Sequence, residues 1–154
     1  MNELELIDNL PAMDWKYKVA YLAHKLHEMA QAECPVEHIM QGDEYIRQIR
    51  VPAGSVVIGR VHIHGHLVQL LEGTVLNVTE EGRQEITGPY EFVSAPGYQV
   101  VCVAVTDIVA RTVHKNPDGV TDWKVLEARD FVPAEATLER GKMVEQKLLE
   151  ARAA

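Results

Sequence analysis

The stretch from residue 44 to 114 constrains the fold most strongly. It is dense in Val, Ile and Thr, and a turn signal interrupts it every six to twelve residues. The turn signals are Pro52-Ala53-Gly54, Glu72-Gly73, Glu80-Glu81-Gly82, Gly88-Pro89 and Ala95-Pro96-Gly97. They separate candidate strands over 45–51, 55–63, 66–72, 74–79, 83–87, 91–94, 98–106 and 108–114. About eight short antiparallel strands without intervening helices predict a mainly β sandwich or small barrel of jelly-roll type.

Helical patterns flank this β region on both sides. After a potential cap at Asp14, apolar residues recur at spacings of three and four over 15–32, and Pro35 closes the segment. Pro133 opens a second helix over 134–152 at a first-turn position. We therefore predict an N-terminal helical segment (1–34), a β-barrel (35–132) and a C-terminal helix (133–154), which together form one folded domain.

Composition excludes several classes of function. The 154 residues carry 15 Lys and Arg against 23 Asp and Glu, so the net charge of −8 argues against a nucleic-acid partner. The longest apolar runs, such as 100–105, fall far short of the roughly 20 residues that a membrane span needs. The start of the chain is acidic and lacks the features of a signal peptide, and two cysteines make no disulfide framework. We expect a cytoplasmic protein with no membrane partner.

The histidines carry the clearest chemical signal. His62, His64 and His66 alternate along one predicted strand, so their side chains would point to the same face. Three imidazoles make poor core residues unless something satisfies their nitrogens. The Cα atoms of His62 and His66 would lie roughly 13 Å apart on a straight strand, and Gly65 permits a bend that swings His66 back. His114, at the end of a later strand, is the expected partner.

A divalent transition metal would satisfy these imidazoles. Neutral imidazole binds Zn, Fe, Ni or Mn, and the predicted ligands are His62, His64, His66 and His114. The alternative is a wet, polar interior in which the histidines bond to water and to one another. The sequence does not select one metal.

These residues resemble the cupin pattern, Gly-x5-His-x-His-x3,4-Glu-x6-Gly. Gly59, His62, His64 and Gly73 stand in this order, and His66 occupies the position of the glutamate. The second cupin motif is partly present between Gly88 and Gly97, with Val100 where a histidine is expected and His114 one strand later. The resemblance implies a cupin-like jelly-roll barrel with a metal site.

Residues 36–130 resemble more closely the small cupin-like proteins common in tailed-phage genomes. The shared pattern consists of Tyr45-Ile46-Arg47, Pro52-Ala53-Gly54, His62 to His66, Pro96-Gly97, Thr112-Val113-His114 and Thr121-Asp122. This resemblance implies fold and metal rather than a substrate, and it would place a phage-encoded protein in the host cytoplasm.

Basic and phenolic side chains near the histidines are candidates for ligand binding. Arg60 shares strand parity with His62, and Tyr45 shares it with Arg47. An arginine beside a metal can hold a carboxylate or phosphate by bidentate hydrogen bonds. We therefore predict Arg47, Arg60 and Tyr45 as substrate-binding residues, with salt bridges at the barrel rim as the alternative role.

Two functions follow from these expectations. The first is a metal-dependent enzyme acting on a small molecule, in which a metal held only by histidines keeps open coordination positions. The second is a non-catalytic, metal-stabilised binding or assembly module. A binder of small ligands without turnover would use the same pocket, so the sequence leaves enzyme and binder open. Because cupins are often dimers, we expect a homodimer or other homo-oligomer.

Overall fold

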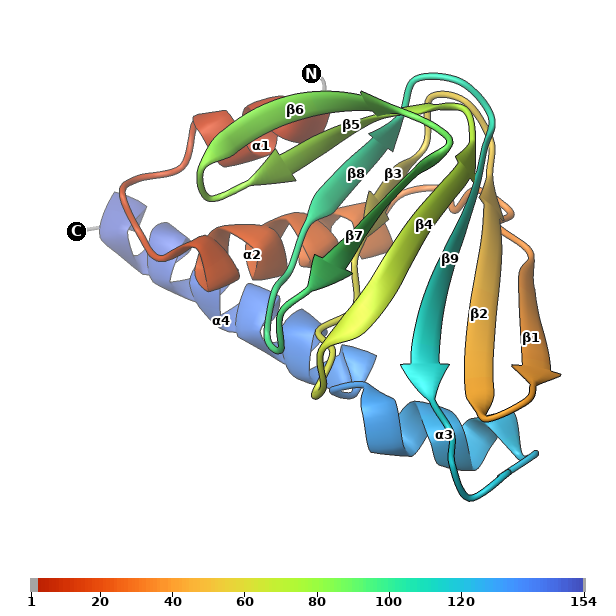
Figure 1. Cartoon of the computed structure of the whole chain (residues 1–154). Coiled ribbons are helices and arrows are strands. Elements are labelled where there is room, and N and C mark those ends of the chain that lie inside the picture. The colour runs from red at the N-terminus through yellow and green to blue at the C-terminus, as the bar shows by residue number, and fades with distance from the viewer. Residues whose placement is uncertain (1–2, 154) are drawn as a thin grey trace. The chain divides into compact units, whose positions relative to one another are not determined.

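The computed structural model describes residues 3–153, which form two compact units. One unit spans Ala32–Val132, and the other combines the terminal segments up to Gln31 and from Pro133 onward. Figure 1 shows the elements of both units along the chain. Each unit is described separately below.

Two antiparallel sheets make up the unit that spans Ala32–Val132. The described residues of this unit form nine strands, in the orders β1-β2-β9-β4-β7 and β3-β8-β5-β6 (Figure 1). The bounds are β1 (Val36–Gln41), β2 (Glu44–Val51), β3 (Val56–Ile58), β4 (His66–Glu72), β5 (Thr74–Thr79), β6 (Gly82–Thr87), β7 (Tyr90–Ser94), β8 (Val101–Ala104) and β9 (Ile108–Lys115). The predicted small antiparallel β fold is confirmed.

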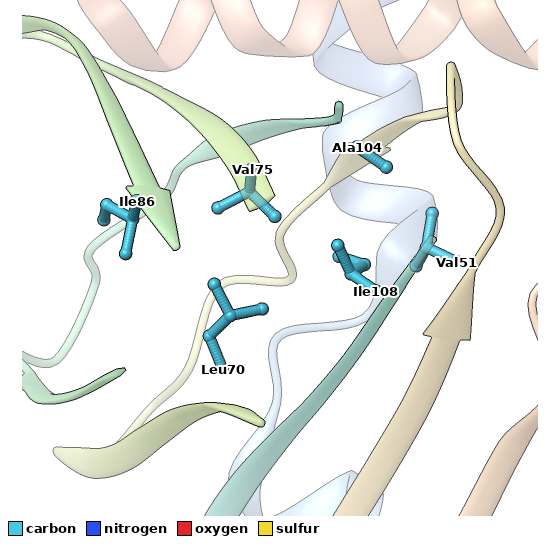
Figure 2. Packing of buried hydrophobic residues seen from close by; sticks show 6 residues of the cluster. All are labelled: Val51, Leu70, Val75, Ile86, Ala104 and Ile108. Atoms are coloured by element: carbon cyan, nitrogen blue, oxygen red, sulfur yellow. The ribbon is translucent and has the colours of Figure 1, made fainter. Parts of the chain in front are cut away.

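The hydrophobic core of this unit lies between the two sheets. Three of its six buried members come from the five-stranded sheet and three from the four-stranded sheet, and their side chains gather in Figure 2: Val51, Leu70, Ile108, Val75, Ile86 and Ala104. Alternation along each strand turns one set of side chains inward, so both sheets contribute to one shared core.

The chain passes from one sheet to the other at Gly73. The register of β4 against β9 shifts between Leu70 and Glu72, and Gly73 then adopts φ +91°. A Cβ atom at this position would lie 2.2 Å from the carbonyl oxygen of Asp107. Only glycine permits both the backbone conformation and this close approach.

The strand predictions hold for most strands of the two sheets, but two predicted strands are too long and one strand was missed. The predicted strand 55–63 shortens to β3, and 59–65 form a loop that contains only an isolated bridge from His62 to Phe131. The strand predicted over 98–106 shortens to β8. β1 was not predicted, because its sequence is not rich in β-branched residues. It forms by pairing with β2, in a register that sets Val36 opposite Ile49.

A helix that the sequence analysis did not predict follows β9. This helix, α3 (Trp123–Asp130), begins after Asp122, whose side chain accepts a hydrogen bond of 3.0 Å from the backbone N–H of Lys124. Asp122 is therefore an N-cap. The helix is only eight residues long and has little amphipathic periodicity, which explains why the sequence pattern misses it.

The terminal segments form a helical unit of α1 (Glu3–Asp8), α2 (Trp15–His27) and α4 (Ala134–Ala153). The C-terminal helix matches its prediction, whereas the N-terminal helix predicted over 15–32 ends at His27. Gly141 of α4 is buried against α2, and a Cβ atom there would lie 2.1 Å from the carbonyl oxygen of Ala20. The absence of a side chain therefore permits the close packing of α2 and α4.

None of the helices within residues 3–153 is long and apolar enough to cross a membrane.

Candidate functional site

Three of the four predicted metal ligands lie together inside the β unit. His62, His66 and His114 are all buried, with exposed fractions of 8%, 6% and 5%. The ring centroids of His62 and His66 are 3.5 Å apart, and each lies 5.3 Å from the centroid of His114. The three side chains come from the loop after β3, the first residue of β4 and the seventh residue of β9. Separate elements therefore converge on one cluster.

His64 lies outside this cluster. Its side chain is exposed, because residues 63–64 form a bend rather than a strand. Backbone hydrogen bonds of 2.9 Å hold the loop in place: Gly97 donates to the carbonyl of His62, and Ile63 donates to that of Asp130. The expectation of a common face for His62, His64 and His66 is wrong in this respect. The expected bend near Gly65 does bring His66 back to His62.

Hydrogen bonds select the ring nitrogens that remain available. Nδ1 of His62 donates to the carbonyl oxygen of Arg60 at 2.9 Å, and Nδ1 of His66 lies 3.4 Å from that of His64. A carbonyl oxygen can only accept, so both rings carry the proton on Nδ1 and keep a lone pair on Nε2. His114 differs, since its Nε2 lies 2.9 Å from the hydroxyl of Thr112.

Burial keeps these imidazoles neutral. The pKa of His62 is lowered to about 3, mainly by burial and in addition by the neighbouring His66 and His114. Burial also lowers the pKa of His114 to about 4, against the opposing effect of the Asp130 carboxylate. The pKa of His66 is lowered for the same main reason. Neutral imidazole is the form that binds metals.

The described residues also contain one His and two Glu whose potential ligand atoms all lie within 4.8 Å of one another. This group is His24, Glu28 and Glu145 in the helical unit. The potential ligand atoms of the barrel histidines do not all lie this close to one another. The ammonium group of Lys25 pairs with Glu145 and lies 3.8 Å from Glu28 Oε2. A lysine thus already supplies the positive charge, and we interpret the group as an ion-pair network between α2 and α4.

Both predicted arginines reach a single carboxylate beside the histidine cluster. Arg47 Nε donates to Glu127 Oε1 at 3.3 Å, and Arg60 Nη1 lies 3.5 Å from Glu127 Oε2. Arg60 also donates to the carbonyl of Val132 at 3.3 Å, and its guanidinium carbon lies 4.5 Å from the ring centroid of Phe131. Phe131 in turn contacts the ring of His62 at a centroid distance of 4.5 Å. The arginines and histidines therefore share one environment.

Tyr45 is fully buried and does not line the cavity of the barrel. Its hydroxyl lies 2.7 Å from Nδ1 of His38, and its ring centroid lies 5.6 Å from that of His114. Burial raises the pKa of Tyr45 to about 12. The structure thus places Tyr45 behind the histidine cluster, where it supports His114, rather than in the cavity where it would touch a ligand.

Sequence reasoning missed three residues of this site, all contributed by α3 or its end: Glu127, Asp130 and Phe131. Asp130 is 3% exposed, and its carboxylate accepts two hydrogen bonds from Arg129, at 3.0 and 3.1 Å. The sequence signal that could have predicted α3 is Thr121-Asp122, because aspartate is a typical N-cap residue at the start of a helix. Without that helix, nothing in the sequence brings these residues to the barrel.

A cavity of about 250 Å³ opens into the barrel beside the cluster. Arg47, Arg60, His62, His66 and Phe131 line one part of it, and apolar core residues such as Leu70 line another. The arrangement can hold a small molecule with its polar group next to two arginines and two histidines.

Comparisons with known proteins concern the fold. The sequence matches no protein-family model and no curated protein. The structure is similar to ectoine synthase from P. lautus, with a TM-score of 0.51 at 14% identity, over 68% of this chain and 78% of that one. It is also similar to a cupin superfamily protein from Desulfitobacterium hafniense, with a TM-score of 0.48 at 11% identity, over 60% and 85%. The fold is the cupin double-stranded β-helix of two antiparallel sheets, with N- and C-terminal helices.

Proposed function

We propose that this chain is a metal-binding protein whose barrel histidines His62, His66 and His114 hold one divalent transition metal (Zn, Fe, Ni or Mn) next to a small-molecule site. His64 is left out of the proposed ligand set because its side chain is exposed. The proposed role is that of a metal-dependent enzyme or binder acting on a small molecule. A non-catalytic metal-stabilised binding or assembly module is the alternative.

One buried nitrogen carries this proposal. His62 Nε2 is buried and has no hydrogen-bond partner within the described part of the chain. An unsatisfied polar atom in a protein interior costs roughly 1–3 kcal/mol, so such an atom calls for a ligand. The Nδ1 hydrogen bond of the same ring leaves a lone pair on Nε2, and the two neighbouring rings are neutral as well. These donors suit a transition metal.

The rings of His62 and His66 stack with an angle of 17° between their planes. Metal binding would therefore require the rings to turn until their free nitrogens face a common point. The torsion that turns an imidazole ring is broad and roughly twofold, so the rings can turn about it. The closeness of the rings and their origin on three elements support the proposal.

The cavity favours a functional metal over a purely structural one. A closed site with four protein ligands has no room for a substrate, whereas a functional site keeps an open position. His62 and His66 both line the cavity. When bound there, a divalent metal would supply Lewis acidity to an oxygen of the bound small molecule. The side chains of the barrel would bind and orient that molecule and exclude water from it.

Elemental analysis of protein purified without chelator or nickel affinity tests the proposal. We expect close to one equivalent of a single transition metal in the wild type and a large loss in His62→Ala, His66→Ala and His114→Ala. His64→Ala is the matched control, since it removes an exposed imidazole from the same loop. Less than about half an equivalent in the wild type, or equal loss in His64→Ala, would refute the proposed site.

The same variants separate the two functions. If the metal serves a small molecule, the three site variants stay folded after losing it, as judged by circular dichroism. If the metal is structural, they lose their fold or their assembly together with the metal.

Three further proposals depend on the sequence alone. They are homo-oligomeric assembly, location in the cytoplasm, and kinship with the cupin-like proteins of tailed phages. Light scattering on the purified protein tests the first of these, and a mass equal to that of one chain would contradict it.

A further inference from the structure

The charges around the barrel cavity are unbalanced. Two arginines, Arg47 and Arg60, line it, and no Asp or Glu is among the described residues that do. Both guanidinium groups pair with the single carboxylate of Glu127, and the Asp130 carboxylate already pairs with Arg129, so one positive charge is left over. The chain as a whole has a net charge of −8, so the local charge at this cavity has the opposite sign to the net charge of the protein.

The guanidinium group of Arg60 also has an unused donor. Its Nε is buried without a hydrogen-bond partner among residues 3–153, although Nη1 reaches Glu127 and Nη2 donates to Val132. A buried donor next to a positively charged cavity indicates a missing acceptor. Arginine binds carboxylates and phosphates through two parallel N–H bonds, so an anionic group on a ligand would supply that acceptor.

The cavity changes from polar to apolar along its length. On β4, His66, Val68 and Leu70 line it in that order, because alternate residues of a strand face the same side. On β9, the lining residues likewise change from polar to apolar, in the order Thr112, Ala110 and Ile108. The Cα atoms of residues four positions apart on a strand are roughly 13 Å apart. A ligand that fills this space needs one polar end and one apolar end.

The volume limits the size of that ligand. At about 250 Å³ the cavity lies below the roughly 300–1,000 Å³ that is typical of sites for drug-sized molecules. Its apolar part is lined by Leu70, Val75, Ile86 and Ile108, which also belong to the hydrophobic core. A nucleotide or a sugar would place polar groups against these side chains without partners, at a cost in free energy.

We propose that the cavity binds a small amphiphilic anion, with its carboxylate or phosphate held by Arg60 and Arg47 and its apolar body directed toward Leu70 and Ile108. This inference deepens the proposed small-molecule function by naming its ligand class. It depends on the arginines rather than on a metal, so the two can fail separately.

Calorimetric titration of chelator-treated protein with four probes tests this inference: hexanoate, hexyl phosphate, hexanamide and acetate. We expect hexanoate or hexyl phosphate to bind at least about 10-fold more tightly than hexanamide, which keeps the apolar body but lacks the charge. Acetate, which keeps the charge but lacks the body, should also bind more weakly. The comparison of hexanoate with hexyl phosphate assigns the anionic group.

Arg60→Gln should weaken binding of the preferred anion by about 10- to 100-fold, while Arg50→Gln should leave it unchanged. Arg50 is exposed on the same strand as Arg47, so it controls for the overall charge. Should Arg60→Gln fail to fold, Arg60→Lys and Arg47→Gln provide the same test, because each removes part of the paired donors. Equal binding of hexanoate and hexanamide, or unchanged binding in all Arg60 and Arg47 variants, would overturn the inference.

Repeating the titration with metal-loaded protein separates this inference from the metal proposal. Anion binding that requires metal and is unaffected by Arg60→Gln would show that the metal alone holds the anion, which contradicts the inference. Anion binding in chelator-treated protein that Arg60→Gln abolishes would support it even if elemental analysis found no metal.

Discussion

The imidazole rings of His62 and His66 stack with their centroids 3.5 Å apart, although a straight strand would hold their Cα atoms roughly 13 Å apart. The loop that precedes β4 makes this contact possible. Backbone hydrogen bonds tie this loop to Gly97 and Asp130. The chain turns there so that the ring of His62 lies against that of His66, while the side chain of His64 is exposed. This contact brings two of the three proposed metal ligands together.

Removal of the metal should lower the thermal stability of the wild type. A ligand that binds only the folded state at 100 times its Kd contributes about 2.7 kcal/mol. We expect chelator to lower the Tm of the metal-loaded wild type by several degrees and to leave the Tm of His62→Ala unchanged. Thermal unfolding followed by circular dichroism makes this comparison. An equal shift in both proteins would show that the chelator acts elsewhere.

Gly73→Ala should be among the most destabilising single changes in the β unit. The new Cβ atom would meet the carbonyl oxygen of Asp107 at 2.2 Å, in a backbone conformation with φ +91°. We expect a loss of about 3 kcal/mol in the free energy of unfolding, measured by urea denaturation. Gly82→Ala is the control, because its φ is also positive but nothing lies within 4 Å of the new atom. That variant should lose only about 1 kcal/mol, and similar losses in both would contradict the close-approach argument.

Gly141→Ala should destabilise the helical unit even though alanine is the better helix former. Propensity alone would stabilise α4 by about 1 kcal/mol. The new Cβ atom would lie 2.1 Å from the carbonyl oxygen of Ala20 and 2.6 Å from Cβ of His24, and α2 and α4 would have to separate. We expect a net loss of about 1–3 kcal/mol by chemical denaturation followed at 222 nm. Lys147→Ala, on an exposed position of the same helix, is the control. A gain in stability for Gly141→Ala would refute this packing.

Tyr45→Phe should reduce stability without changing anion binding. The variant removes the hydroxyl that lies 2.7 Å from His38 Nδ1, while the ring remains fully buried. Loss of one buried hydrogen bond costs about 1 kcal/mol in the free energy of unfolding, which urea denaturation measures. Tyr90→Phe is the control, since that residue is 46% exposed and its loss of a hydroxyl should cost little. Weaker hexanoate binding in Tyr45→Phe, at unchanged stability, would instead assign Tyr45 to the ligand.

The pairing of Glu145 with Lys25 should make stability depend on pH. The hydrogen-bonded ammonium of Lys25 holds the pKa of Glu145 below its ordinary value of 4.5. The unfolded chain therefore takes up this proton at a higher pH than the folded chain. The resulting stability is fully present above about pH 4.5 and is lost as the pH falls through the lowered pKa of the folded state.

Glu145→Gln tests this dependence. At pH 7 the variant should lose up to about 1 kcal/mol, because the pair is partly exposed and screened by solvent, and the difference from wild type should shrink in acid. Denaturant midpoints at several pH values measure it. Glu139→Gln removes an exposed carboxylate near Lys142 in the same helix and should show no comparable change. A loss that persists unchanged in acid would exclude the charge as its cause.

Much of the fold could be predicted from local sequence patterns. β-branched residues between turn signals located the central strands, an apolar repeat located α2 and Pro133 marked the start of α4, because such patterns reflect contacts within a few residues. β1 and α3 could not be found in this way. β1 depends on the edge of a neighbouring strand, and α3 has a cap but no apolar stripe.

The candidate site, like the fold, was predicted from the sequence only in part. The sequence predicted that His62, His66 and His114 would meet in a small barrel, and it selected Arg47 and Arg60 as their neighbours. It also predicted His64 as a ligand and Tyr45 as a ligand-binding residue, whereas the structure exposes the first and places the second behind His114. Alternation fixes the direction of a side chain only where the backbone is extended, and the loop 59–65 is not.

The sequence by itself determined which chemical groups this protein carries and that a small antiparallel barrel would hold them. Strand propensity, turn residues and the spacing of histidines are local properties that survive without knowledge of the fold. Only the tertiary structure decided which imidazoles share one space, that Glu127 joins the two arginines, and that one end of the cavity is apolar. Those relations depend on hydrogen bonds and packing between segments that lie 30 to 80 residues apart, as between Arg47 and Glu127.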